Sequence, residues 1–299
     1  MIVVGVDGGG TKTKATCIEC RGGVGTLVSS YETEGSNFHN VGIKTATKRI
    51  KEAIDRCTEG RTPDLVVMGL AGLDSRYDFN VLRENLSSVG KEVIMDNDSF
   101  FILYGETRGK NGVIAISGTG SVVLGIKDGE KVRAEGAGWF LSDTGSAYWV
   151  GRETLRYLTR CLQGIESSSM LSETVMRSLK LKDLDDLIYW TYHRKHRVEM
   201  VASISRLVDK ASSRGDEIAQ GILKRASREF GRSVLHVVRK TNVSEVYVLG
   251  GMFKSKAYME EFKNLMGENN VRVLPVDKDP SMGSVLYGLD KVNCKLNGY

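Results

Sequence analysis

A glycine-rich turn near the N-terminus carries the strongest chemical signal in the sequence. It reads Asp7, Gly8, Gly9, Gly10, Thr11, Lys12 and Thr13. Three glycines let the backbone approach a bulky group closely, with N–H donors that can face an anion. The threonines and Lys12 add hydroxyl groups and a positive charge, and Asp7 is placed to hold a magnesium-bound water. A plain hairpin turn needs only one or two glycines, so these residue types predict a phosphate-binding turn.

This turn is not a Walker A loop. That motif, G-x-x-x-x-G-K-[ST], opens a helix. Here the apolar run Ile2–Val6 precedes the turn, and Thr11–Glu19 alternates apolar or small residues with polar ones, which is typical of a half-buried strand. The turn therefore joins two strands.

Two later glycine segments repeat parts of this pattern. Ser117–Ser121 contains Gly118, Thr119 and Gly120 between two apolar runs, and Gly250 and Gly251 follow a third run. We expect the first of these segments to be a second phosphate-binding turn, although a purely structural turn fits it equally well when taken alone. Glycine at 250 and 251 would let a flat base and a ribose lie against the chain, whereas simple close packing is the alternative.

A cluster of acidic residues follows the short apolar run Val93–Met95. Ligands bind at the carboxyl ends of strands in open α/β sheets, so a carboxylate at Asp96 or Asp98 could accept a proton from an attacking hydroxyl group. A helix is expected directly afterwards, and Asp is a good N-cap. We therefore expect Asp98 to be the base and Asp96 to be the capping residue.

The segment Gly136–Arg152 combines glycines, two tryptophans and a single acidic residue, Asp143, ahead of a helix. Aromatic rings beside polar acceptors suit a sugar, which has an apolar face and a rim of hydroxyl groups. A capped helix with buried aromatic rings is the alternative interpretation.

Strands and helices alternate along the chain, which predicts an α/β fold. The expected helices span residues 43–57, 78–88, 100–107, 145–161, 183–193, 198–212, 216–240, 255–267 and 283–292. Two hairpins with glycine turns, each followed later by an apolar strand ending in glycine, indicate a duplicated domain. We expect a first domain over residues 1–110, joined by a C-terminal helix at 285–299, and a larger, more helical second domain over residues 111–284.

Composition excludes several classes of protein. The chain of 299 residues has a formal net charge of +5, but the basic residues form no stripe of the kind that binds nucleic acid. No apolar stretch approaches the roughly 20 residues that span a membrane, and the N-terminus lacks a signal-peptide layout. The four histidines (His39, His193, His196 and His236) show no metal-binding spacing.

Five scattered cysteines argue against a disulfide framework. Cys17 and Cys20 form a C-x-x-C, but no second pair follows at the spacing of a zinc site. We therefore expect reduced cysteines with a structural role and a cytoplasmic location.

Seven motifs, taken in order, resemble the sugar-kinase branch of the actin-like ATPase superfamily. They are GVDGGGTKTKA (5–15), GSNFHNVG (35–42), GLAGLDS (69–75), ND (97–98), ISGTGS (116–121), GAGWFLSDTGSAYWVGR (136–152) and VLGGMF (248–253). The closer resemblance is to the BadF/BadG/BcrA/BcrD-type group, which includes N-acetylglucosamine kinases and archaeal ATP-dependent hexokinases. It covers nearly the whole chain and implies a duplicated, ribonuclease H-like fold of two domains with a ligand cleft between them.

The resemblance also implies roles for individual residues. ATP phosphates would be held by Gly8, Gly9, Gly10, Thr11, Lys12, Gly118, Thr119 and Gly120, with Gly250 and Gly251 lining the adenosine pocket. Asp7 would help to position Mg²⁺, and Asp98 would be the catalytic base. Sugar hydroxyl groups, with O6 as the expected acceptor, would be bound by Asn37, Asp98, Thr119 and Asp143. A homodimer formed through the second-domain helices is also implied.

An ATP-hydrolysing activator of a protein partner is the alternative function, because one branch of the same group activates dehydratases. That branch shares an iron–sulfur cluster between subunits, and Cys161 has no partner cysteine in the glycine-rich context that such a cluster requires. The sugar-facing segments 35–40 and 136–145 favour the kinase.

Overall fold

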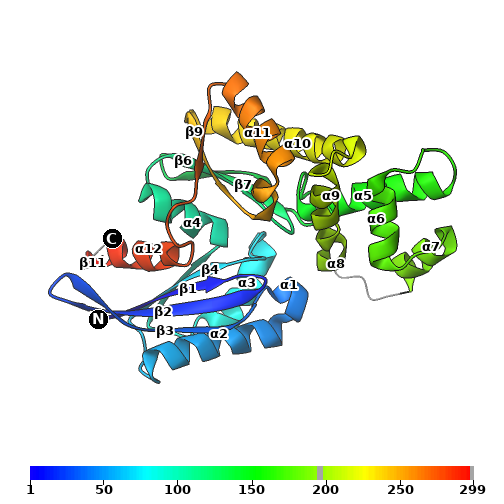
Figure 1. Ribbon diagram of the computed structural model, residues 1–299. Helices are drawn as coiled ribbons and strands as arrows, with labels where there is room; N and C mark the ends of the chain where they lie inside the picture. Colours follow the sequence, from blue (N-terminus) through cyan, green and yellow to red (C-terminus); the bar gives the residue numbers. More distant parts are fainter. Residues whose placement is uncertain (194–197, 297–299) are drawn as a thin grey trace. The chain divides into compact units, whose positions relative to one another are not determined.

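The computed structural model describes residues 1–193 and 198–296, and the chain forms two units (Figure 1). The first unit comprises Met1–Asn111 and Val276–Tyr299, and the second comprises Gly112–Pro275. The chain returns to the first unit at Val276 rather than near residue 285. The reason is local, because the backbone N–H of Lys278 donates to Glu106 at 2.9 Å and its ammonium group donates to the carbonyl of Gly105 at 2.6 Å.

The first unit is built on a six-stranded sheet with the order β11-β3-β2-β1-β4-β5. The strands are β1 (Ile2–Gly8), β2 (Lys12–Arg21), β3 (Val24–Glu34), β4 (Leu65–Leu70), β5 (Glu92–Asp96) and β11 (Lys295–Leu296). The helices are α1 (Phe38–Val41), α2 (Ile43–Thr58), α3 (Arg76–Leu86), α4 (Asp98–Thr107) and α12 (Met282–Lys291). Strands β1, β2 and β3 run antiparallel, whereas β4 and β5 run parallel to β1.

Both faces of this sheet are covered by helices. One apolar cluster joins the central strands to α2 and α3, and another joins them to α4 and α12. All six residues of β4 are buried, as expected for a strand between two helical layers. Helix α12 lies close to β1 because Gly5 has no side chain; a Cβ there would overlap Val285.

The second unit contains a five-stranded sheet with the order β10-β9-β6-β7-β8. Its strands are β6 (Gly112–Ser117), β7 (Ser121–Lys127), β8 (Glu130–Glu135), β9 (Glu245–Leu249) and β10 (Arg272–Pro275). Its helices are α5 (Ala147–Leu162), α6 (Met170–Leu179), α7 (Leu184–Tyr192), α8 (Val198–Ser203), α9 (Ser205–Ser212), α10 (Glu217–Thr241), α11 (Lys256–Glu268) and the 3₁₀ helix η1 (Gly251–Lys254).

The two sheets have the same topology, which confirms the predicted duplication. Strands β6 to β10 repeat the order of β1 to β5: in each unit an antiparallel three-stranded meander is extended by two parallel strands. The second unit is more helical, as expected. The single helix predicted over 198–212 was wrong, because the chain breaks at Ile204 into α8 and α9. Helix α6 and strand β10 were not predicted.

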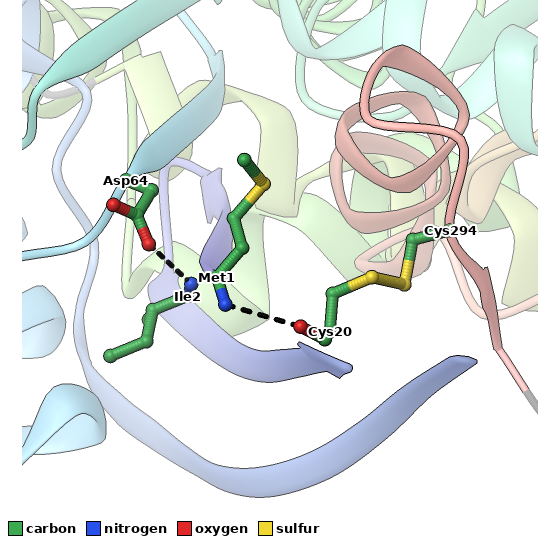
Figure 2. The surroundings of a disulfide bond; sticks show 5 residues. All are labelled: Met1, Ile2, Cys20, Asp64 and Cys294. Atoms are coloured by element: carbon green, nitrogen blue, oxygen red, sulfur yellow. Dashed lines mark hydrogen bonds between the residues drawn. A yellow bond between two sulfur atoms is a disulfide. The ribbon is translucent and has the colours of Figure 1, made fainter. Parts of the chain in front are cut away.

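A disulfide joins Cys20 at the end of β2 to Cys294 after α12 (Figure 2). The expectation that all cysteines are reduced was therefore wrong for this pair. Strand β11 pairs with the start of β3, and this pairing brings Cys294 beside the β2–β3 hairpin. Nearby, the N-terminal ammonium group donates to the carbonyl of Cys20 at 3.1 Å, and the backbone N–H of Ile2 donates to Asp64 at 2.7 Å.

Among the described residues, Cys17, Cys57 and Cys161 are free thiols. The same part of the chain contains no helix that is both long enough and apolar enough to cross a membrane.

Candidate active site

Three parallel strands of the first unit end at the same edge of the sheet. The strand register places Asp7 of β1 beside Gly69 of β4, and Gly69 beside Asp96 of β5. The glycine turn, the loop after β4 and the Asn97–Asp98 pair therefore follow directly from neighbouring strand ends. This edge is where an open α/β sheet binds ligands, and the residues predicted for the first domain gather there.

The loop that contains Gly35 and Ser36 holds the first glycine turn in shape. The backbone N–H of Gly35 donates to the carbonyl of Thr11 at 2.9 Å, and that of Ser36 donates to the carbonyl of Gly9 at 3.0 Å. A Cβ on Gly35 would overlap the carbonyl oxygen of Gly10, so this position requires glycine. The motif at 35–42 therefore supports the turn with its backbone.

Gly10 itself has a different environment. No atom of the described residues, apart from its chain neighbours, lies within 4 Å of a Cβ built there, and its φ is not left-handed. Neither packing nor backbone conformation therefore explains the glycine. Free approach of a ligand to the backbone would account for it.

The two lysines of β2 form ion pairs beside the turn. The ammonium group of Lys12 lies 3.0 Å from Glu32, with both side chains more than half exposed. The ammonium group of Lys14, the strand partner of Asp7, lies 3.3 Å from Asp279 and 3.1 Å from the hydroxyl group of Ser281.

Asp7 lies in an unfavourable environment for a carboxylate. Desolvation by burial, followed by the negative charge of Asp279, raises the pKa of Asp7 to about 6, against the opposing charges of Lys12 and Lys14. Asp279 itself is partly desolvated, but hydrogen bonds from Ser281 and the charge of Lys14 lower its pKa below the usual value. Sequence reasoning missed Asp279, because only the packing of α12 against β1 brings it to this edge.

The residues predicted as base and cap lie at the start of α4. The N-cap is Asn97, whose side-chain oxygen accepts from the N–H of Ser99 at 3.1 Å, so the assignment of the cap to Asp96 was wrong. Asp98 is the first residue of the helix, where the N-terminal dipole stabilises a negative charge. Asp96 accepts from the backbone N–H of Asn97 at 2.8 Å.

Asn37 caps the short helix α1, and its Oδ1 accepts from the N–H of His39 at 3.1 Å. A Cβ on Gly72, in the loop after β4, would lie 2.7 Å from this same oxygen. Asn97 donates to Asp74 in that loop at 2.9 Å. The loop after β4 thus touches both Asn37 and the residue that precedes Asp98.

The second unit holds its own group of predicted residues. The turn between β6 and β7 is closed by a hydrogen bond from Gly118 N–H to the carbonyl of Gly120 at 2.9 Å. A Cβ on Gly120 would lie 2.6 Å from a carboxylate oxygen of Asp143, which is buried. Gly250 adopts a φ of 117°, and a Cβ there would overlap the carbonyl oxygen of Ser117.

Gly118 resembles Gly10, because no atom of the described residues beyond its chain neighbours lies within 4 Å of a Cβ placed there and its φ is ordinary. Gly251 is equally open and begins η1. Thr119 stands at the tip of the turn, and its carbonyl accepts from the N–H of Tyr148 in α5 at 3.2 Å.

Glu135 anchors the loop that carries Asp143. It accepts from the hydroxyl of Ser142 at 2.7 Å, from the N–H of Thr144 at 3.0 Å and from the hydroxyl of Ser233 at 2.6 Å. Sequence reasoning missed this role, because a glutamate at the end of a strand looks like any exposed charge.

The histidines lie apart in the described residues. Nε2 of His39 lies 3.1 Å from the carbonyl of Gly72 and 3.3 Å from Asp78, His193 stacks on Tyr189, and His236 is exposed on α10. His196 lies outside the described residues. No group of three or more His, Cys, Asp or Glu side chains within the described ranges could by itself hold a metal ion.

Comparison with known proteins gives consistent results. The chain is 28% identical over 95% of its length to an N-acetylmuramic acid/N-acetylglucosamine kinase of Clostridium acetobutylicum, of which it covers 97%. It is 29% identical over 97% of its length to an N-acetyl-D-glucosamine kinase of Dictyostelium discoideum, of which it covers 98%.

The fold is shared with the crystal structure of a candidate N-acetylglucosamine kinase from Chromobacterium violaceum. The TM-score is 0.79 at 22% identity, with 96% of this chain and 98% of that chain covered. The predicted actin-like α/β fold is thus confirmed. Residues 4–286 match the sequence model of the BadF/BadG/BcrA/BcrD ATPase family, and the chain belongs to this family.

Proposed function

We propose that this protein transfers a phosphoryl group from ATP to a hydroxyl group of a hexose or N-acetylhexosamine, with O6 as the acceptor. One observation supports this most strongly. The strand register puts the open glycine turn after β1 and the Asn97–Asp98 pair after β5 at one edge of the first sheet. The named relatives, an N-acetylmuramic acid/N-acetylglucosamine kinase and an N-acetyl-D-glucosamine kinase, indicate the class of acceptor.

In the first unit, the backbone N–H group of Gly10 would donate to a phosphate oxygen, with the hydroxyl group of Thr11 beside it. Gly8 and Gly9 would let the phosphates approach the turn, which the Gly9 N–H closes by donating to the carbonyl of Lys12 at 2.9 Å. Phosphoryl transfer depends mainly on positioning and on charge stabilisation. Asn37 would hold a sugar hydroxyl group, and Asp98 would accept the proton of the attacking hydroxyl. Lys12 would reach the phosphates by leaving its exposed ion pair with Glu32, which costs about 1 kcal/mol or less.

In the second unit, the N–H groups of Thr119 and Gly120 would bind phosphate beside Gly118, whose own N–H closes the turn. Gly250 and Gly251 would lie against adenosine. Asp143 and the hydroxyl group of Thr119 would hold the sugar. The carboxylate of Asp143 is buried against Gly120, so its position depends on the loop that Glu135 anchors.

The carboxylates of Asp7 and Asp279 fit Mg²⁺, because hard oxygen ligands suit this ion and their mutual repulsion would be relieved by a cation. Mg²⁺ supplied with ATP neutralises the charge that develops on the phosphoryl oxygens. We propose that Asp7 holds it through a bound water, with Asp279 adding negative charge and keeping Lys14 in place.

A coupled ADP-release assay tests the proposal across glucose, mannose, glucosamine and N-acetylglucosamine. Asp98→Asn should lose a factor of about 10²–10⁴ in turnover, the usual contribution of a general base, while the affinities for ATP and sugar change little. Asp96→Asn, two residues away, is the matched control and should keep most of its turnover. Near-normal turnover of Asp98→Asn would remove Asp98 from the mechanism.

ATP hydrolysis that no sugar stimulates would instead favour the activator function. We further propose a homodimer formed through helices of the second unit, which light scattering of the purified chain would test.

A further inference from the structure

A cavity of about 600 Å³ opens in the second unit between α5 and α7. We call it the α5–α7 cavity. Its volume lies within the usual range for a small-molecule site, about 300–1,000 Å³. None of the residues assigned to ATP, to the sugar or to Mg²⁺ lines it.

One wall of the cavity is a stripe on α5. Tyr148, Arg152, Arg156, Thr159 and Gln163 recur at intervals of three or four residues, so they share one face of the helix. The opposite wall is apolar and comes mainly from α7, with Leu187 and Ile188 among its residues. The cavity therefore has a polar, cationic side and an apolar side.

The positive charges on and beside the α5 wall outnumber the carboxylates that pair with them. Glu153 is the carboxylate partner of three guanidinium groups: Arg225 at 2.7 Å, Arg156 at 2.9 Å and Arg152 at 3.6 Å. The Nε atom of Arg152 is buried, and its 3.6 Å approach to Glu153 is an ion pair too long for a hydrogen bond. One carboxylate beside three guanidinium groups leaves positive charge that an anion bound in the cavity would offset.

Aromatic rings stand beside the two arginines. The rings of Trp139 and Tyr148 lie with centroids 5.3 Å apart, and Trp139 is 44% exposed. Both arginines act electrostatically on the Tyr148 hydroxyl, yet burial keeps its pKa above the ordinary value, so it remains a hydrogen-bond donor. Flat rings bind the apolar face of a sugar ring, and guanidinium groups bind carboxylate or phosphate in a bidentate manner.

We propose that the α5–α7 cavity binds a sugar-sized anion, whose carboxylate or phosphate is held by Arg152 and Arg156 and whose ring lies against Trp139 and Tyr148. The backbone N–H of Tyr148 donates to Thr119 in the second glycine turn, so the cavity begins one residue contact away from that turn. The anion could have either of two origins. It could be an acidic substituent of the sugar substrate, an assignment that rests on the proposed function. It could also be a separate anionic effector, an assignment that does not depend on that function.

Calorimetric titration of the purified full chain with glucuronate and with glucose 6-phosphate tests the site directly. Replacing both arginines (Arg152→Gln with Arg156→Gln) should weaken binding of at least one of these ligands tenfold or more. Arg225→Gln is the matched control, because it removes a partner of the same Glu153 from outside the cavity, and its affinity should stay within twofold. The double variant is informative only if it unfolds at the same temperature as the wild type. If it unfolds at a lower temperature, the single variant Arg156→Gln, at an exposed position, is compared with the wild type instead.

Repeating the titration with saturating N-acetylglucosamine separates the two sources. Competition identifies an acidic substituent of the substrate, and unchanged binding identifies a separate effector. A titration with N-acetylglucosamine alone comes first. If that sugar does not bind, the result contradicts the proposed function. The anion titration still tests the cavity, because binding of the anion requires no turnover.

Three results would overturn the site. The first is no heat of binding from either anion at millimolar concentration. The second is an equal loss of anion affinity in the double variant and in Arg225→Gln. The third is a molecular mass of the double variant in solution that is half that of the wild type. The last would show that a second copy of the chain covers this face.

Discussion

Replacing Gly10 or Gly118 by alanine separates two explanations of the glycine turns. At both positions a Cβ would meet no atom of the described residues beyond the chain neighbours within 4 Å, and neither φ is left-handed. If the glycines serve only the turn, alanine should be harmless. If they let phosphate reach the backbone, the new methyl group should block it while the fold stays intact.

The structure sets the expected sizes of both effects. A hydrogen bond to a charged group contributes about 1.5–3 kcal/mol, so losing one such bond to phosphate should weaken ATP binding about 10- to 150-fold. Stability should be unchanged or rise by about 0.4–1 kcal/mol, because alanine restricts the unfolded chain. Gly221→Ala is the control: it is equally open and lies in α10, away from any turn.

Calorimetric titration with ATP and Mg²⁺, together with thermal unfolding, measures both quantities on the same samples. Wild-type ATP affinity in both Gly10→Ala and Gly118→Ala would refute the phosphate-binding role of the turns. Gly250→Ala should behave differently and lower the unfolding temperature, because its φ is 117° and its Cβ would overlap the Ser117 carbonyl. A stable Gly250→Ala protein would show that the reasoning from close contacts is wrong.

The remaining predictions concern stability and the sugar loop. Cys294→Ser should lower the free energy of unfolding in urea by about 2–4 kcal/mol, because the disulfide closes a separation of 274 residues; dithiothreitol should do the same to the wild type, and Cys161→Ser should match the wild type. Glu135→Ala should raise the KM for the sugar more than the KM for ATP, because Ser142 and Thr144 lose their shared acceptor; equal changes in both constants would contradict this. Raising the pH from 4 to 7 should destabilise the wild type relative to Asp7→Asn, as measured by urea unfolding.

Local pattern was enough to predict the two glycine-turn hairpins. Each glycine turn lies between two runs of apolar or alternating residues, and this arrangement predicted both β1–β2 and β6–β7. Strand β4, Leu65–Leu70, shows the same kind of local signal, since six successive apolar or small residues suit a strand covered on both faces. The duplication followed from these pieces alone.

The misses come from short segments and from long-range contacts. Helix α6 has only ten residues and buries only two apolar side chains, Leu171 and Val175, and β10 has only four residues. The disulfide depends on the pairing of β11 with β3, and the approach of Asp279 to Asp7 depends on the packing of α12 against Gly5. The spacing of residues in a sequence does not indicate that Cys20 lies near Cys294 or that Asp7 lies near Asp279.

Glu135 and Asp96 show a second limit. Asp, Asn and Ser all cap helices well, so the pattern Asp-Asn-Asp before α4 could not decide which residue is the N-cap, and the structure gives Asn97. Glu135 contacts a loop and a distant helix through three hydrogen bonds. A single charged residue in a sequence does not reveal which donors will surround it.

The environment of Asp7 determines the direction in which stability changes with pH. A carboxyl group whose pKa is about 6 in the folded chain, against 3.8 in the reference state, binds its proton more tightly when folded. The folded form therefore carries more protons than the unfolded form between these values, and stability falls as the pH rises from about 4 to about 6. At 1.36 kcal/mol per pKa unit, the loss from this group is about 3 kcal/mol.

Other carboxylates shift stability in the opposite direction, so the difference between wild type and Asp7→Asn isolates the effect. Asp7→Asn has no charge to desolvate and should gain about 3 kcal/mol over the wild type between pH 4 and pH 7. A bound cation would relieve the same penalty; millimolar Mg²⁺ at pH 7 should therefore stabilise the wild type and leave Asp7→Asn unchanged. A difference that stays constant with pH would mean that Asp7 is not held at a cost. A partly buried carboxylate kept ionised at a loss of stability would be explained by the cation that we propose it binds.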